Sequence, residues 1–484
     1  MSRPPSVLII GAGFGGIGLG FLLRRAGIRS FTILEKAQSL GGTWRENTYP
    51  GAACDVPSHM YQYSFAPKAD WSRKWAPQAE ILQYMTEVAE DSGVVDHIRF
   101  GIAVEGAIWD EETRQWVVTV ADGRTIRADI LVSAVGQLHH PATPEIPGLE
   151  SFPGRTFHSA QWPADLDLHG RRVGVVGTAA SAVQVVPAIA DDTQHLTVFQ
   201  RSANWILPRG DRPYRDWEQR AFASIPGMAR VYRTWIWANY EARFPTLRGR
   251  RAFVRLAERM LHRHLNDKVT DPDLRRQLTP DYPVGARRVL SADDYYPALM
   301  RADVDLVTSP IDRLTPEGVQ LSDGRSIPLD VVVWATGFRS TEFLAPMDII
   351  GREGRRLGND WRDGARAFLG LSLPGYPNLF IMYGPNTNLG HNSILFMLEC
   401  QARHIVTCLQ GMHHGDEIEV RADVFEEFNT RLQADLARTV WGSVDHSWYK
   451  DEAGRITNNW SSGTPRYWWL TRRSPSHAYR HTRR

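Results

Sequence analysis

Glycines at a spacing that suits phosphate binding follow an apolar run near the start of the chain. Residues 6–10 (SVLII) have the composition of a buried parallel strand, and Gly11, Gly13 and Gly16 then give the pattern G-x-G-x-x-G. The first glycine permits a tight turn, the second lets the backbone approach a pyrophosphate, and the third lets helix pack on strand. Glu35 ends the next predicted strand, where its carboxylate can accept hydrogen bonds from ribose hydroxyls. These residues predict an FAD site with the diphosphate at a helix N-terminus.

A second, altered copy of this unit begins at the apolar residues 172–176 and Gly177. Its next predicted strand ends at Arg201, and the interval from Gly177 to Arg201 equals that between the corresponding residues of the first unit. A carboxylate at this position suits a free ribose, whereas a guanidinium suits the 2′-phosphate of NADP. The second unit is therefore predicted to bind NADPH, with Thr178 and Ser181 in its phosphate loop.

The second loop departs from the glycine pattern at two positions. Ala179 and Ala182 stand where the first loop has its second and third glycines. Alanine is an accepted variant at the third position, but at the second its methyl group crowds the approach of the pyrophosphate. We expect this loop still to bind NADPH, with the nucleotide slightly farther from the backbone or more weakly held.

Both units close with the same pattern. Residues 121–136 (ADGRTIRADILVSAVG) and 322–337 (SDGRSIPLDVVVWATG) each contain an Asp-Gly hairpin turn, a strand, an Asp, a buried strand and then Ala-x-Gly. A single glycine loop would be weak evidence, but two units with matching spacing and matching closing strands indicate a duplication. The sequence thus predicts an α/β fold with two Rossmann-like dinucleotide-binding domains, one for FAD and one for NADPH.

The predicted FAD-binding domain is discontinuous. It comprises residues 1–148 and 376–484, because a strand that ends in a Gly-Pro-Asn turn near residue 384 is typical of a ligand-facing edge in a doubly wound fold. The predicted NADP-binding domain comprises residues 149–210 and 284–375.

A helical insertion is predicted at residues 211–283, within the NADP-binding domain. Its segments have apolar residues at helical spacing, and it is rich in arginine and tryptophan. Two interpretations stay open. The insertion is either an amphipathic cap packed on the cofactor domains with solvated arginines, or a lid over a substrate tunnel that also touches membranes.

Composition narrows the classes of function. The chain has 484 residues, a net charge of +2 and three scattered cysteines. No global field favours nucleic acid, and the lack of a Cys-x-x-Cys pair argues against a disulfide framework and a flavin disulfide reductase. We expect a cytoplasmic protein without a metal site and without stable membrane insertion, since the apolar residues 7–23 contain six glycines.

Two longer motifs resemble signatures of the type I Baeyer–Villiger monooxygenases, a family of class B flavoprotein monooxygenases. Residues 152–163 (FPGRTFHSAQWP) fit F-x-G-x-x-x-H-x-x-x-W-P, and residues 41–55 fit a second family signature. The matching positions are Phe152, Gly154, His158 and Trp162 in the first motif and Thr43, Trp44 and Asp55 in the second. Similarity also covers the block 384–388 with Asn386, and it extends over essentially the whole chain.

The resemblance implies a reaction. NADPH reduces FAD, a C4a-peroxyflavin forms with O2, and one oxygen atom is inserted next to the carbonyl of a small apolar ketone to give an ester or lactone. By the same resemblance, Arg288 is the catalytic arginine, Asp55 orients it, and Arg287 grips the NADP phosphate where the family has lysine. A fixed guanidinium suits this chemistry, because the peroxide and the adduct are both anionic. The residues expected to contact FAD are Gly11, Gly13, Gly16, Glu35, Thr43, Trp44, Asp55 and Asn386, and those expected to contact NADPH are Gly177, Thr178, Ser181, Arg201 and Arg287.

Alternatives remain at several positions. The chain could oxygenate nitrogen or sulfur instead of a ketone, or be a non-catalytic flavin redox sensor. Arg288 could form an ordinary ion pair and Asp55 could cap a strand end. His158 could couple cofactor movement to catalysis or be purely structural, and Trp44 and Trp162 could be packing anchors. The sequence predicts neither the ketone nor the oligomeric state.

Overall fold

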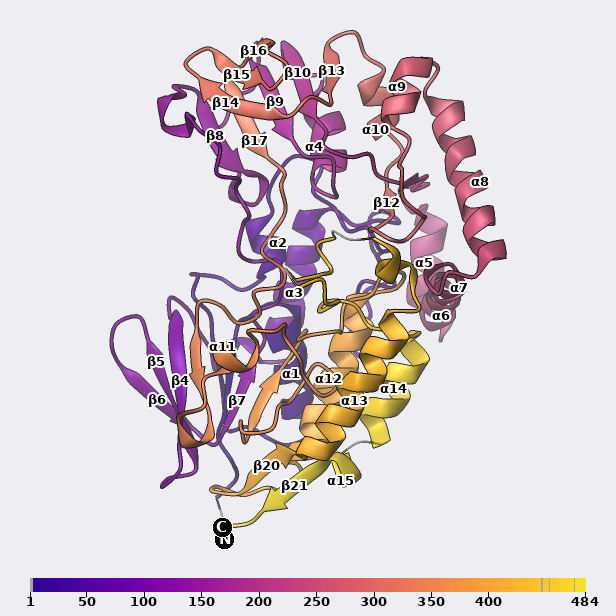
Figure 1. Cartoon of the computed structure of the whole chain (residues 1–484). Coiled ribbons are helices and arrows are strands. Elements are labelled where there is room, and N and C mark those ends of the chain that lie inside the picture. The colour runs from indigo at the N-terminus through magenta and orange to yellow at the C-terminus, as the bar shows by residue number, and fades with distance from the viewer. Residues whose placement is uncertain (1–2, 445–446, 452, 474) are drawn as a thin grey trace.

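The computed structural model describes residues 3–444, 447–451, 453–473 and 475–484. Two units lie one above the other, each built around a five-stranded parallel sheet (Figure 1). The first sheet has the order β19-β7-β1-β2-β3. Its strands are β1 (Val7–Ile10), β2 (Phe31–Leu34), β3 (Ile98–Arg99), β7 (Ile130–Ser133) and β19 (Leu379–Ile381).

The second sheet repeats this arrangement in the order β8-β17-β9-β10-β13. Its strands are β8 (Arg155–His158), β9 (Arg172–Val176), β10 (His195–Phe199), β13 (Val304–Val307) and β17 (Val331–Trp334). Strands β1, β7 and β17 are buried at every position, as continuous apolar runs in parallel sheets require. The predicted pair of Rossmann-like units is confirmed.

Each unit also carries a smaller, mainly antiparallel sheet, joined to its parallel sheet by the duplicated closing segment. The turns at Gly123 and Gly324 have φ of +82° and +87°, and the preceding aspartates, Asp122 and Asp323, accept hydrogen bonds from the backbone two residues later. The first of these sheets has the order β18-β4-β5-β6 and the second β14-β15-β16. The strands are β4 (Val104–Asp110), β5 (Gln115–Val120), β6 (Thr125–Ala128), β14 (Ile311–Thr315), β15 (Gly318–Leu321), β16 (Ser326–Pro328) and β18 (Asp348–Ile350).

Strand β18 corrects one predicted boundary. It pairs in parallel with β4, with Ile349 opposite Ala107, and therefore belongs to the first unit. The chain has returned to that unit well before residue 376, where the sequence placed the return. A three-residue strand carries too little apolar periodicity to be recognised in the sequence.

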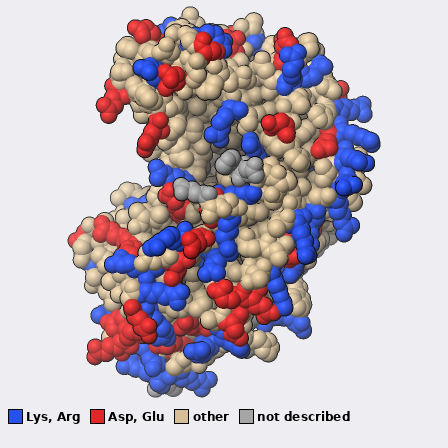
Figure 2. All heavy atoms as spheres, viewed as in Figure 1, with Lys and Arg blue, Asp and Glu red and all other residues tan. Residues whose placement is uncertain are grey.

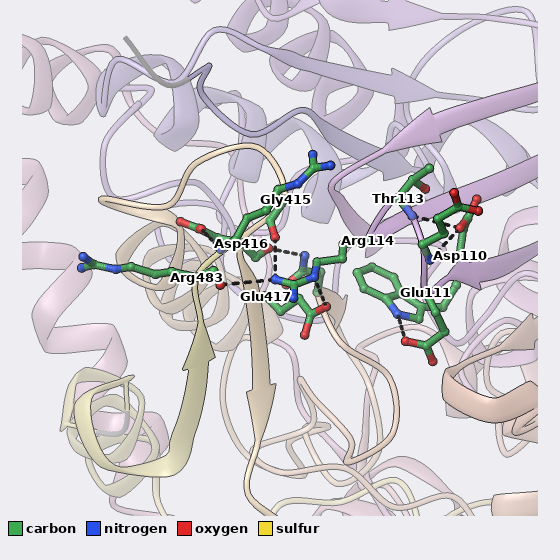
Figure 3. Close-up of polar contacts among 12 residues, drawn as sticks. Asp110, Glu111, Thr113, Arg114, Gly415, Asp416, Glu417 and Arg483 are labelled. Carbon is green, nitrogen blue, oxygen red and sulfur yellow. Dashed lines mark hydrogen bonds and ion pairs between the residues drawn. The ribbon is translucent and has the colours of Figure 1, made fainter.

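Helices pack together beside the first sheet and cover it (Figure 1). Helices α1 and α12 pack against each other, and α14 packs on α12. The C-terminal strands β20 and β21 pair with each other next to these helices. Arg114 joins them to the first unit: it donates hydrogen bonds to the carbonyls of Gly415 (3.4 Å) and Arg483 (3.3 Å), and it lies 3.3 Å from Glu417 Oε1 (Figure 3). The bounds are α1 (Phe14–Arg25), α3 (Gln78–Asp91), α12 (Ile394–Leu409), α13 (Ala422–Leu436), α14 (Thr464–Arg473), β20 (Glu417–Val420) and β21 (Tyr479–Thr482).

The predicted insertion is helical and rests on both units. Phe222 and Ile236 join the core of the first unit, whereas Leu265 and Leu278 join that of the second. The insertion leaves and rejoins the second unit at two short paired strands, β11 (Ile206–Leu207) and β12 (Leu290–Ser291). Its helices are α5 (Asp216–Ser224), α6 (Met228–Glu241), α7 (Phe244–Leu247), α8 (Arg251–Lys268) and α9 (Pro272–Gln277).

The remaining helices are short. They are α2 (Thr43–Glu46), α4 (Ala182–Ile189), α10 (Tyr295–Leu299), α11 (Leu357–Asp360) and α15 (Pro475–Ala478). Within the described ranges, no helix is long and apolar enough to cross a membrane.

Candidate active site

The first glycine loop has the geometry that a diphosphate needs. Gly11 has φ of +103°, and a Cβ there would lie 2.7 Å from the carbonyl oxygen of Ala134. A Cβ on Gly16 would lie 2.0 Å from the carbonyl oxygen of Gly11, so this position tolerates no side chain without a shift of the backbone. At Gly13, which caps α1, the nearest atom to a Cβ is 3.9 Å away, in Gly42. The loop therefore offers an open backbone approach to the helix N-terminus.

Glu35 is held at the end of β2 beside this loop. It is buried, its Oε2 accepts a hydrogen bond from the Ala12 amide (2.9 Å), and its Oε1 accepts one from Ala37 (3.0 Å). Arg45 lies 3.2 Å from Oε1 and is a partner that the sequence did not indicate. The carboxylate is thus fixed where a ribose on the loop would reach it, and its contact with that ribose stays a prediction.

A cavity of about 380 Å³ runs from this loop to the edge of the second unit. We call it the cofactor cavity. Several of the predicted residues line it: Gly11, Gly13, Glu35, Thr43, Trp44, Asp55 and Arg288. Gln137 also lines it, and its Oε1 is buried without a hydrogen-bond partner among the described residues. A glycine-lined cradle, a fixed carboxylate and an unpaired acceptor together fit FAD.

Asp55 and Arg288 form an ion pair at the wall of the cofactor cavity. Arg288 Nη2 donates to Asp55 Oδ2, and the two side chains are 36% and 32% exposed. Asp55 belongs to the first unit, whereas Arg288 lies two residues before β12 at the base of the insertion. The Asp55 carboxylate raises the pKa of Arg288, so the guanidinium stays cationic at any working pH.

Tyrosines lie near this cation. Tyr383 lines the cofactor cavity, has φ of +56°, and donates from its hydroxyl to Asn388 Oδ1 (2.9 Å). Burial raises the pKa of Tyr383 to about 12, so it stays a neutral phenol. Trp44, also on the wall, donates from Nε1 to the hydroxyl of Tyr61 (3.1 Å). Trp44 therefore lines the cavity and is held in place by its contact with Tyr61.

Asn386 lies outside the set of residues that line the cofactor cavity. Its side-chain amide donates to the carbonyls of Ile456 (2.8 Å) and Asn459 (3.1 Å), so it braces the loop. Asn388, two residues later, lines the cavity in its place. Both residues belong to the block that the sequence singled out, but residue type alone does not distinguish a brace from a wall residue.

The second loop repeats the steric pattern of the first at its first glycine. Gly177 has φ of +113°, and a Cβ there would lie 2.5 Å from the carbonyl oxygen of Ala335. Helix α4 begins at Ala182, the position that corresponds to Gly16, whereas α1 begins at Phe14, two positions earlier in its own unit. The first helical hydrogen bonds nevertheless correspond, since the Val183 amide donates to Ala179 O (3.1 Å) as the Ile17 amide donates to Gly13 O (3.0 Å). The Ala182 side chain is fully buried.

Several polar side chains surround the second glycine loop and the end of β10. Asn204 Nδ2 donates to the carbonyl (2.9 Å) and the hydroxyl (3.1 Å) of Thr178. Ser181 caps α4 without using its hydroxyl for the cap. Arg287 Nη1 donates to Ser202 Oγ (2.6 Å), and among the described residues the exposed Arg201 side chain forms no hydrogen bond or ion pair. Two guanidinium groups therefore flank the end of β10, where the 2′-phosphate is expected.

The linker motif is structural in its contacts. Phe152 is buried with the β14-β15-β16 sheet, and a Cβ on Gly154 would lie 2.3 Å from the carbonyl oxygen of Asp330. His158 Nδ1 accepts from the Ala160 amide (3.1 Å), so its Nε2 carries the proton and donates to Gly337 O (2.8 Å). Burial lowers the pKa of His158, which keeps it neutral. Trp162 packs edge-on against Phe157, with ring centroids 5.2 Å apart.

None of the four linker residues lines the cofactor cavity. The contacts favour the structural interpretation of His158 and Trp162, and any part they have in cofactor movement stays a prediction. The three cysteines, all within the described ranges, are buried and unpaired.

The comparisons with known proteins agree with this geometry. Residues 8–215 match a family described as pyridine nucleotide-disulphide oxidoreductase. A Baeyer-Villiger monooxygenase of Streptomyces coelicolor is 38% identical over 471 residues, which cover 96% of this chain and 91% of the relative. A Baeyer-Villiger monooxygenase of Pseudomonas aeruginosa is 38% identical over 482 residues, covering 99% and 92%.

A solved structure gives the same result for the fold. The crystal structure of OTEMO in complex with FAD and NADP has a TM-score of 0.88 and 28% sequence identity, and the match covers 100% of both chains. Similarity in sequence and in structure thus extends over both dinucleotide units and the helical insertion. The chain therefore belongs to the Baeyer–Villiger monooxygenase family.

Proposed function

We infer that this chain uses NADPH and O2 to insert one oxygen atom next to a ketone carbonyl, giving an ester or a lactone. The observation that carries this inference is the Asp55–Arg288 pair, which places a permanent cation on the wall of the cavity that the FAD-type glycine loop opens into. When bound, FAD supplies the electrons, taken from NADPH, with which O2 is activated.

Arg288 supplies a fixed positive charge to this site. Negative charge develops at the ketone oxygen as the carbonyl is attacked, and a preorganised cation stabilises it without reorganisation. Asp55 orients the guanidinium and keeps it protonated. Removing one such stabilising group costs about 10²–10³ in turnover.

The walls of the cavity select what reaches this cation. Apolar residues form part of the lining, among them Val56, Met382, Leu395 and Leu398. They exclude water and favour an apolar ketone of small size. The buried and unpaired cysteines support activity in a reducing cytoplasm.

The inference is tested by replacing Arg288 with alanine and with lysine. Both variants should keep their FAD and be reduced by NADPH at the normal rate, because Arg288 belongs to the oxygen-insertion step. Ester formation, scored by product mass, should be lost in Arg288→Ala and partly retained in Arg288→Lys, which keeps the charge but not the planar fork.

A normal ester yield from Arg288→Ala would overturn the assignment. A panel of linear, cyclic, aromatic and polycyclic ketones, run beside a thioether, then separates ketone oxidation from heteroatom oxygenation. Product mass is the readout, because uncoupled turnover also consumes NADPH.

A further inference from the structure

The outer surface of the helical insertion exposes large apolar side chains. On α6, Val231 and Trp235 are 70% and 59% exposed. On α8, Phe253, Leu256 and Met260 are 43%, 56% and 58% exposed. Residues spaced by three or four positions lie on one side of a helix, so each helix presents an apolar row to solvent. We call these five residues, with the arginines of α8 described next, the insertion surface.

Arginines lie beside the apolar rows. Residues 228–263 contain nine arginines and no lysine, against two glutamates. One of the two, Glu241, accepts hydrogen bonds from Thr464 and Asn392 in the interior. Arg251, Arg255 and Arg259 follow one another by single helical turns along α8, and no described residue forms a hydrogen bond or ion pair with their exposed side chains. The other glutamate, Glu258, lies on α8, but no ion pair with a described residue neutralises this cationic row.

The figures show where this surface lies. Helix α8 runs along the outer right edge of the molecule, with α5, α6 and α7 at its lower end (Figure 1). Figure 2 shows the same edge covered by Lys and Arg, with little acidic charge among them. The net charge of the whole chain is only +2, so this concentration of positive charge is local.

We propose that the insertion surface docks on an anionic lipid bilayer. Guanidinium groups bind phosphate oxygens of headgroups in a bidentate manner, while neighbouring apolar side chains enter the boundary between headgroups and acyl chains. An acidic protein would neutralise the arginines, but a narrow row of separate apolar side chains alongside a row of cations does not form the compact apolar centre of a protein interface.

The α6 part of the insertion surface is one helix away from the cofactor cavity. On α6, Trp235 faces outward, whereas the next residues, Ile236 and Trp237, face the interior. Trp237 Nε1 donates to Thr464 Oγ1 (3.0 Å), and its carbonyl accepts from Asn392, which lines the cofactor cavity. A bilayer on the outer side of α6 would thus adjoin the wall of the cavity, where apolar substrates dissolved in lipid can enter.

The experiment is sedimentation of the purified holoenzyme with vesicles, without substrate. Phosphatidylcholine vesicles are compared with vesicles that also contain phosphatidylglycerol. The enzyme should bind only the anionic vesicles, and added salt should release it. The variant R251Q/R255Q/R259Q should bind on the order of 100-fold more weakly, since each basic residue near a membrane surface contributes about fivefold. The variant F253S/L256S/M260S should lose on the order of tenfold or more.

A matched control keeps the test specific. Arg124, Arg313 and Arg325 are exposed arginines on the strands or hairpin turns of the two smaller sheets, so R124Q/R313Q/R325Q loses the same charge elsewhere. This control should bind anionic vesicles like the parent. Equal weakening in both arginine variants, or no binding by the parent, overturns the proposal. Polyglutamate is the probe for an acidic protein partner. If the enzyme binds polyglutamate and F253S/L256S/M260S binds it equally well, the partner is an acidic protein and the bilayer proposal is overturned. Vesicle binding needs no turnover, so it is independent of the oxidation inferred above.

Discussion

Replacing Arg201 with glutamine should change the choice between the two nicotinamide nucleotides. The equal intervals in the sequence place Arg201 opposite Glu35, but the strand registers make the buried Gln200 the counterpart of Glu35, because Ile10 pairs with Leu34 and Val176 with Phe199. Arg201 is the next residue, and its exposed guanidinium has no hydrogen-bond or ion-pair partner among the described residues. Its removal breaks no hydrogen bond or ion pair with another described residue. Any effect on nucleotide binding therefore comes from a lost contact with the ligand, and the 2′-phosphate is the group that distinguishes NADPH from NADH.

The magnitude follows from the kind of bond that is lost. A hydrogen bond to a charged group contributes about 1.5–3 kcal/mol, which corresponds to about 10- to 150-fold in a dissociation constant. Arg287 lies nearby, tied to Ser202 and with its guanidinium 4.6 Å from the ring centroid of Tyr282. It retains part of the phosphate affinity, so R201Q should lie at the lower end of this range and R201Q/R287Q near the upper end. Affinity for NADH should stay unchanged in both.

The assay is anaerobic reduction of the bound flavin, followed by loss of its yellow colour at increasing concentrations of NADPH or NADH. Arg171 provides the matched control, because it is also exposed but precedes β9, at the opposite end of the same parallel sheet. R171Q should leave both affinities unchanged. A loss of NADH affinity equal to that of NADPH in R201Q would refute the phosphate assignment, and so would an unchanged preference for NADPH.

Three further outcomes are expected. Asp55→Asn removes the anionic partner of Arg288 and should lower ester formation about 10- to 100-fold while flavin reduction by NADPH persists; equal losses in both steps would contradict a positioning role. Gly16→Ala should yield protein without FAD, because the added Cβ would lie 2.0 Å from the carbonyl oxygen of Gly11. The control Ala182→Gly, in the second loop, should leave the FAD content normal. Absorbance at the flavin band measures the FAD content of both variants. His59 is buried among aromatic rings with both ring nitrogens unpaired in the described part of the chain, and burial lowers its pKa to about 4. Below a pH of about 6.5 the unfolded chain takes up a proton that the folded chain refuses, so stability should fall by about 2 kcal/mol on acidification to about pH 5. His59→Phe should remove that part of the fall in a urea titration, and an unchanged pH dependence would contradict the assignment.

The sequence predicts features that depend on local sterics or on repetition. Spacing alone identifies Gly11 and Gly177, and in both units a Cβ would collide with the carbonyl oxygen of the alanine after the closing strand. That pairing of loop and strand explains why the segments 121–136 and 322–337 are duplicated together with the glycine loops. The helical insertion was equally visible, because its period differs from that of the strands around it.

Features that depend on contacts between distant segments were not predictable from the residues themselves. Arg45 reaches Glu35 only because α2 folds back over the glycine loop, and nothing in the residue types indicates this. Asn386 and Asn388 are chemically identical, and only the fold makes one a brace and the other a wall residue. Strand β18 is positioned by its pairing with β4, and its own three residues give no signal of that pairing.

The ion pair at the centre of the proposed chemistry depends on how the two units are placed. Asp55 belongs to the unit with the FAD-type loop, and Arg288 lies where the helical insertion rejoins the other unit, next to the paired strands β11 and β12. The insertion packs on both cores, so it fixes the distance between the two halves of the pair. Because neither unit carries the pair alone, oxygen insertion requires this mutual placement, whereas the glycine loop and Glu35, which are predicted to hold FAD, lie within the first unit. Variants that loosen the insertion should therefore keep their flavin and lose ester formation before they lose the fold.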